Sequence, residues 1–73
     1  MARANTVSLV NSLNRMYRQS EAGYAAADTE LARVFWLTRK YDCAWVLASL
    51  TDDDQWWSQY DTDLTALQTH LSV

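Results

Sequence analysis

The side chains best suited to catalysis are one cysteine and one histidine. Cys43 and His70 are the single thiol and the single imidazole of the 73-residue sequence, and such a pair could supply a thiolate nucleophile and its base. Catalysis would also need a cleft around the pair, which a chain this short has little material to build. Cys43 lies in an apolar segment and His70 lies close to the C-terminus. We therefore expect a buried, inert thiol, a solvent-exposed histidine, no catalytic residue and no enzymatic activity.

Three consecutive acids, Asp52, Asp53 and Asp54, form the densest group of oxygen ligands. A calcium loop would also require a glycine and a distal glutamate after such acids, and neither follows. A structural zinc site takes four ligands, usually cysteine and histidine, and the chain has one of each. The acids instead suit the first turn of a helix, where the helix dipole favours negative charge. The sequence predicts no metal and no cofactor.

Two tryptophans and a tyrosine follow these acids closely. Tryptophan and tyrosine are the residues that most often anchor protein interfaces. Adjacent helical positions point about 100° apart, so Trp56 and Trp57 cannot both face one core. Alternating three- and four-residue spacing predicts a core seam at Trp57, Tyr60, Leu64, Leu67 and Leu71. Trp56 lies off that seam and is predicted to face a partner. The complete set of predicted partner-binding residues is Trp56, Asp52, Asp53, Trp57 and Tyr60.

Helices are the elements expected to position these side chains, because residues that favour tight turns are nearly absent. The sequence has no proline and one glycine, Gly23, whereas strand-rich folds need many turns. Apolar residues recur at helical spacing over about residues 5–20, over 24–50 and again after residue 51. The expected helix ends are a break at residues 20–23 and a capping box from Thr51 to Asp54. A further break near residues 39–42 would give four helices in place of three.

The middle segment allows two interpretations. As a helix it would be apolar on every side, and such a helix must be buried on every side. One chain of this length could not surround it, so this interpretation predicts a homodimer, intertwined or side by side. The residues predicted to lie between the chains are Phe35, Trp36 and Leu47. The alternative is an α+β fold with a central β-hairpin, Arg33–Leu37 and Cys43–Leu47, as β-branched and aromatic residues permit. The intervening turn lacks glycine and asparagine, which favours the helix.

Charge is unevenly distributed along the chain, whose net charge is −3. Residues 1–20 carry three arginines and no acid, whereas residues 51–73 carry five aspartates and no lysine or arginine. These opposite charges favour packing of the two end segments, within one chain or across a dimer. A small helical protein could also bind DNA, through Arg15, Arg18, Arg33, Arg39 and Lys40. The acidic net charge counts against nucleic acid, because phosphate contacts dominate such binding.

Residues 1–73 are therefore predicted to form one small all-α domain of three or four helices. No stretch is apolar over the roughly 20 residues that a membrane span needs. A lone cysteine without an N-terminal signal peptide is typical of the reducing cytoplasm. We predict a cytoplasmic, non-enzymatic module that binds a larger protein as a regulator, inhibitor or adaptor. The alternative is a small DNA-binding transcriptional regulator.

Overall fold

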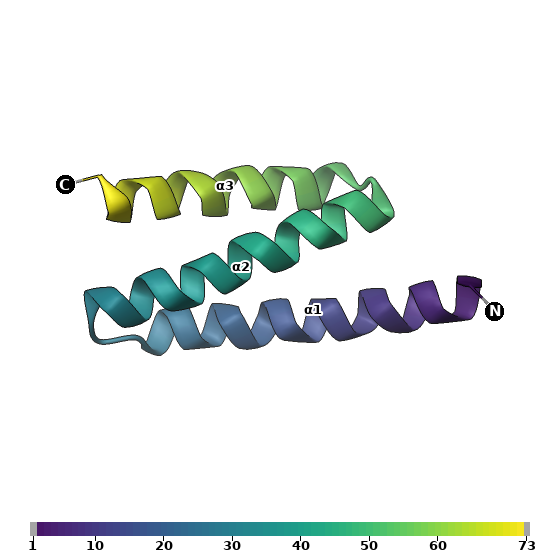
Figure 1. The fold of residues 1–73 in the computed structure, drawn as a ribbon, viewed down its shortest axis with the longest axis horizontal. Helices are drawn as coiled ribbons and strands as arrows, with labels where there is room; N and C mark the ends of the chain where they lie inside the picture. Colours follow the sequence, from purple (N-terminus) through teal and green to yellow (C-terminus); the bar gives the residue numbers. More distant parts are fainter. Residues whose placement is uncertain (1, 73) are drawn as a thin grey trace.

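The chain folds into three α-helices joined by short turns (Figure 1). The computed structural model describes residues 2–72, with side chains from residue 6 onward. Helix α1 spans Ala2–Ala26, α2 spans Glu30–Thr51 and α3 spans Asp54–Leu71. The all-α prediction is confirmed: within residues 2–72 no strand occurs, and residues 33–47 are helical throughout. No helix in this part of the chain combines the length and apolar character needed to cross a membrane.

Helix α1 continues past Gly23, where the sequence predicted a break. Gly23 has no left-handed backbone angle, but a Cβ atom at this position would overlap the indole ring of Trp36. The glycine therefore lets α1 and α2 approach closely, and the predicted turn at residues 20–23 is wrong. The chain reverses at residues 27–29. Thr29 caps α2 there, because its hydroxyl accepts a hydrogen bond from the backbone N–H of Ala32 at 3.1 Å.

The turn between α2 and α3 consists of Asp52 and Asp53. Asp52 has a φ of 52°, in the left-handed region, and its N–H donates to the carbonyl of Ala48 at 2.7 Å. Asp53 caps α3 by accepting from the N–H of Gln55 at 2.9 Å. Thr51, predicted to begin a capping box, instead ends α2 and donates to the carbonyl of Leu47. The three acids thus serve as a C-cap, an N-cap and a first-turn charge.

The helices lie in one layer, with α2 between α1 and α3 (Figure 1). The Cα atoms extend over 45 × 20 × 14 Å. The smallest extent exceeds the roughly 4.6 Å diameter of the Cα cylinder of one helix, so the layer is not flat. Helix α2 packs along both neighbours. Helices α1 and α3 reach each other through long side chains, as where the ring of Tyr17 meets Trp56 at 5.1 Å. One long side of α2 consequently faces solvent.

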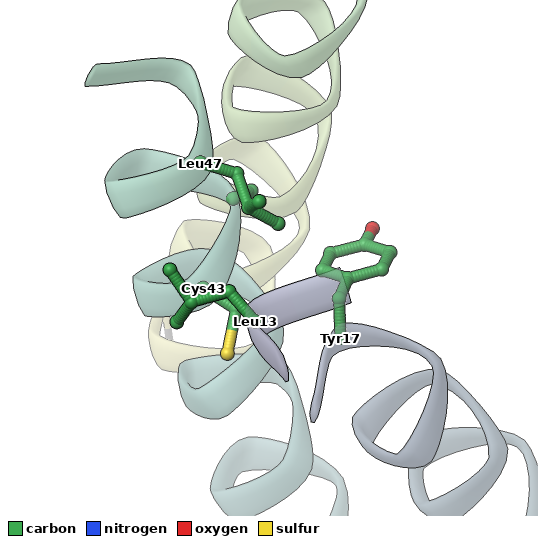
Figure 2. Close-up of a cluster of buried hydrophobic side chains, with 5 residues drawn as sticks. Leu13, Tyr17, Cys43 and Leu47 are labelled. Carbon is green, nitrogen blue, oxygen red and sulfur yellow. The ribbon is translucent and has the colours of Figure 1, made fainter. Parts of the chain in front are cut away.

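The apolar core lies between α1 and α2 and extends to the first turns of α3. Figure 2 shows Leu13 and Tyr17 of α1 beside Cys43 and Leu47 of α2, and Ala44 completes this buried cluster. Further apolar side chains pack around it in part, namely Val10, Val46, Trp56 and Tyr60. The large aromatic groups of α3 therefore complete a core that the small residues of α2 leave open.

Candidate functional site

The acidic turn, defined as Asp52, Asp53 and Asp54, lies at one end of the molecule and is fully accessible. All three residues are exposed, and Asp54 stands in the first turn of α3. The dipole of α3 makes negative charge favourable at its first turn. The predicted acids thus form one local group of negative charge at the start of α3.

Trp57 stands next to this turn and is held in one orientation. Its indole N–H donates to Oδ1 of Asp52 at 3.2 Å, and its ring meets Tyr60 edge to face at 6.0 Å. Tyr60 in turn stacks on Tyr41 of α2 at 5.3 Å. The pKa of Tyr60 is raised by its side-chain hydrogen bond with Tyr41 and then by burial. Trp57 is half-buried and does not belong to the core cluster, so part of its ring is open to contact.

Trp56, predicted to face a partner, is half-buried and packs against the core cluster. The buried face of α3 is rotated from the predicted seam. Asp63 is its most buried residue, while Leu71, placed on the seam by the sequence, is 60% exposed. Trp56 also borders a shallow pocket of about 110 Å³, lined by Tyr17, Arg18, Gln55, Trp56 and Gln59. The adjacent tryptophans do diverge: Trp56 packs against the core cluster, whereas Trp57 packs against Tyr60 and bonds to Asp52.

The residues predicted to lie between two chains are in three different environments. Phe35 is 52% exposed and has the guanidinium of Arg39 5.7 Å from its ring centre. Trp36 is half-buried and covers Gly23. Leu47 is fully buried in the core of the single chain, so it has no surface left for a second chain. Phe35 is therefore the member of this set most available for contact.

A buried polar cluster joins the three helices and was not foreseen from the sequence. It consists of Tyr17, Lys40, Gln59 and Asp63. Oδ2 of the buried Asp63 carboxylate accepts a hydrogen bond from the Tyr17 hydroxyl at 2.9 Å. Its Oδ1 accepts from Gln59 at 3.1 Å and lies 3.4 Å from the ammonium nitrogen of Lys40. Burial, followed by the hydrogen bond to Asp63, raises the pKa of Tyr17 far above its usual value. The sequence does contain a pattern that indicates this buried face of α3. Three- and four-residue spacing also holds for Trp56, Tyr60, Asp63, Leu67 and His70.

The thiol and the imidazole do not form a catalytic pair. Nδ1 of His70 lies 2.5 Å from a carboxylate oxygen of Glu30, and its Nε2 lies 3.1 Å from the hydroxyl of Tyr24. His70 is therefore largely covered, unlike the solvent-exposed side chain that we expected. The hydrogen bond with His70 is the main cause that lowers the pKa of Glu30. Cys43 is buried as predicted, its pKa is raised by that burial, and it lies about 20 Å along α2 from Glu30.

The basic residues of the DNA-binding alternative are dispersed. Lys40 is inside the polar cluster, and Arg18 and Arg33 pair with Glu21 and Glu30 on their own helices. Among the side chains of residues 6–72, the ion pairs between helices are Lys40–Asp63 and Glu30–His70, and both involve α2. The sequence predicted that the basic residues 1–20 pair with the acidic residues 51–73, but both of these ion pairs join α2 to α3.

The described residues contain no group of three or more histidine, cysteine or acidic side chains placed to hold a metal ion. No protein-family model, curated protein or solved structure matches the chain.

Proposed function

We propose that the chain is a non-enzymatic protein-binding module of the cytoplasm, a small regulator, inhibitor or adaptor that docks on a larger protein. The observation that carries this proposal is the position of Trp57. A tryptophan that is partly exposed and fixed by a hydrogen bond to Asp52 has less side-chain freedom to lose when a partner binds. Tryptophans of this kind commonly supply a large share of binding energy.

The acidic turn supports a partner of defined chemistry. Three exposed carboxylates beside one indole suit a surface with an apolar pocket and a rim of lysine or arginine. The rim charges would accelerate association, and the pocket would slow dissociation. The proposed site keeps three residues of the sequence prediction, Trp57, Asp52 and Asp53. Tyr60 packs edge to face against the ring of Trp57. Trp56 leaves the proposed site because it packs in the core.

We also propose that the module acts as a homodimer. Its accessible surface is 5103 Å², whereas a compact monomer of 8.4 kDa is expected to expose about 4,600 Å². The large apolar side chains that it exposes include Leu31, Phe35 and Trp45 of α2. A second chain would cover such side chains, which water disfavours.

Site-specific photo-crosslinking tests the docking site. A photoreactive phenylalanine analogue replaces Trp57 in one variant and Ser58, an exposed neighbour on α3, in a matched control. In the native cell, we expect an adduct of defined mass from position 57 and little from position 58. Excess unlabelled wild-type chain should suppress this adduct, and excess Trp57→Ala chain should not. Equal adducts at both positions, or equal competition by the two chains, would refute docking through Trp57.

A further inference from the structure

The solvent-facing side of α2 carries a regular row of exposed residues. The outer stripe consists of six positions on one face of the helix, Leu31, Phe35, Thr38, Asp42, Trp45 and Ser49. All are exposed except Thr38, which is half-buried. Leu31 is 81% exposed and Trp45 51%. Helical geometry places Lys40 on the opposite side of α2, where it is buried against Asp63.

The spacing of the outer stripe reads the same in both directions. Its steps along the chain are four, three, four, three and four residues, as in the contact seam of a coiled coil. The midpoint falls at position 40. If a second α2 lies antiparallel across this face, a two-fold axis at that level sets Phe35 opposite Trp45 of the other copy. The same axis sets Leu31 opposite Ser49 and Thr38 opposite Asp42. Each large aromatic ring thus meets another.

The charges near the midpoint match a second copy of the same chain. Arg39 and Asp42 are both exposed, and the guanidinium of Arg39 already lies along the stripe, over the ring of Phe35. In the antiparallel arrangement, Arg39 of each chain comes beside Asp42 of the other, so two opposite-charge contacts form about the axis. In a parallel arrangement, Asp42, which lies on the stripe, would face Asp42 of the other chain, which is unfavourable. A partner of one predominant charge would satisfy one of these residues and oppose the other.

The outer stripe runs along most of α2, whose 22 residues extend over about 33 Å. A standard protein interface buries about 800 Å² on each partner, so a stable dimer needs contacts from the flanking parts of α1 and α3 as well as from this stripe. The whole face that holds α2 spans at most 45 × 20 Å between Cα atoms.

We infer that the outer stripe of α2 is the dimerisation surface, and that two copies of this chain pack their α2 helices antiparallel about a two-fold axis near position 40. This inference rests on the proposed homodimer and is independent of docking through Trp57. It assigns Phe35 and Trp45 to the apolar centre of the interface. It assigns Arg39 and Asp42 to the contacts that select the antiparallel direction.

Charge exchange tests the arrangement by analytical ultracentrifugation at micromolar concentration. Arg39→Asp alone and Asp42→Arg alone each create like-charge contacts across the axis, and each should weaken the dimer by about tenfold or more. The double variant Arg39→Asp/Asp42→Arg should restore wild-type dimerisation. An equimolar mixture of the two single variants should also dimerise like wild type, because all charge pairs are then opposite in sign.

Arg15→Asp is the matched control for Arg39→Asp, because Arg15 is exposed on α1 and both substitutions change the net charge by the same amount. It should leave the dimer constant within about twofold. Far-UV circular dichroism should show the same helix content in every variant, since the substituted residues are exposed. A wild-type monomer would overturn both the dimer and the assigned surface. A wild-type dimer that ignores the single exchanges would overturn the surface while the dimer stands. Neither result alters the photo-crosslinking at position 57.

Discussion

Replacing Lys40 by methionine removes the ammonium group that lies 3.4 Å from the Asp63 carboxylate. Asp63 is 1% exposed and keeps its hydrogen bonds from Tyr17 and Gln59, but its charge then has no nearby opposite charge. Leaving one member of a buried ion pair uncompensated typically costs about 3–5 kcal/mol. A 73-residue domain has a total stability of roughly 4–11 kcal/mol. We therefore expect Lys40→Met to lose a large part of its stability or to unfold.

The converse substitution should cost somewhat less. In Asp63→Leu the ammonium of Lys40 remains near the rings of Tyr17 and Tyr24, at 5.7 and 5.2 Å from their centres. Cation–π attraction offsets part of the loss, so we expect about 2–4 kcal/mol. The double variant Lys40→Met/Asp63→Leu should lie close to wild type, because replacing a buried ion pair by apolar residues is often neutral or stabilising. The coupling energy of this cycle should thus be at least about 3 kcal/mol.

Urea unfolding followed by far-UV circular dichroism gives each free energy of unfolding. Arg15→Met, which removes an exposed positive charge on α1, serves as the control and should change stability by less than about 0.5 kcal/mol. If Lys40→Met and Asp63→Leu each cost under about 1 kcal/mol, the pair behaves as a hydrated surface ion pair. The assignment of a buried polar cluster would then be refuted.

Other substitutions test separate parts of the structure. Tyr17→Phe should cost about 1.5–3 kcal/mol at neutral pH, the usual value of a hydrogen bond to a charged group. Because the pKa of Tyr17 is raised, its contribution to the free energy of unfolding is fully present below about pH 10 and is lost as the pH rises further. Thermal melting at rising pH should therefore show a shallower alkaline decline in Tyr17→Phe. Gly23→Ala should destabilise the protein by about 1–3 kcal/mol, because the added methyl group overlaps Trp36, despite the better helix propensity of alanine. Urea unfolding measures this loss, and a more stable variant would contradict the close approach of α1 and α2 at Gly23. Trp56→Ala should cost about 3 kcal/mol by leaving a cavity, again measured by urea unfolding, whereas a partner-facing Trp56 would lose almost nothing.

The number and type of elements could be predicted because local sequence determines them. The lack of proline, and a single glycine, leave few sites at which a helix must end. The helix ends were harder to predict, because Gly23 does not end a helix but lets α1 pack closely against Trp36 of α2. The sequence also predicted a middle helix, over about residues 24–50, that is apolar on all sides. In the structure α1 and α3 cover two sides of this segment, and the third side retains the exposed rings of Phe35 and Trp45.

The rotation of α3 could not be predicted from polarity alone. The sequence prediction turned Trp57 inward because it followed the three- and four-residue spacing of apolar residues, whereas an aspartate such as Asp63 is normally expected at the surface. Asp63 is buried because partners reach it from α1 and α2, and Lys40 stands 23 positions away from it in the chain. Such a partnership depends on how the helices assemble. The sequence therefore predicted which residues gather at the α2–α3 turn, but it did not predict which face of α3 is the most buried.

The single-layer arrangement also shapes how the chain acquires its structure. Each helix packs mainly against its neighbour in sequence, so most contacts close short loops, which favours folding in microseconds to milliseconds. Either hairpin, α1–α2 or α2–α3, can form first. The hydrogen bond between Tyr17 and Asp63 closes 46 residues and needs all three helices in place. Interactions completed after the folding barrier slow unfolding more than they speed folding. The Tyr17–Asp63 hydrogen bond is therefore expected to slow unfolding more than it speeds folding, whereas the Lys40–Asp63 ion pair joins α2 and α3 alone.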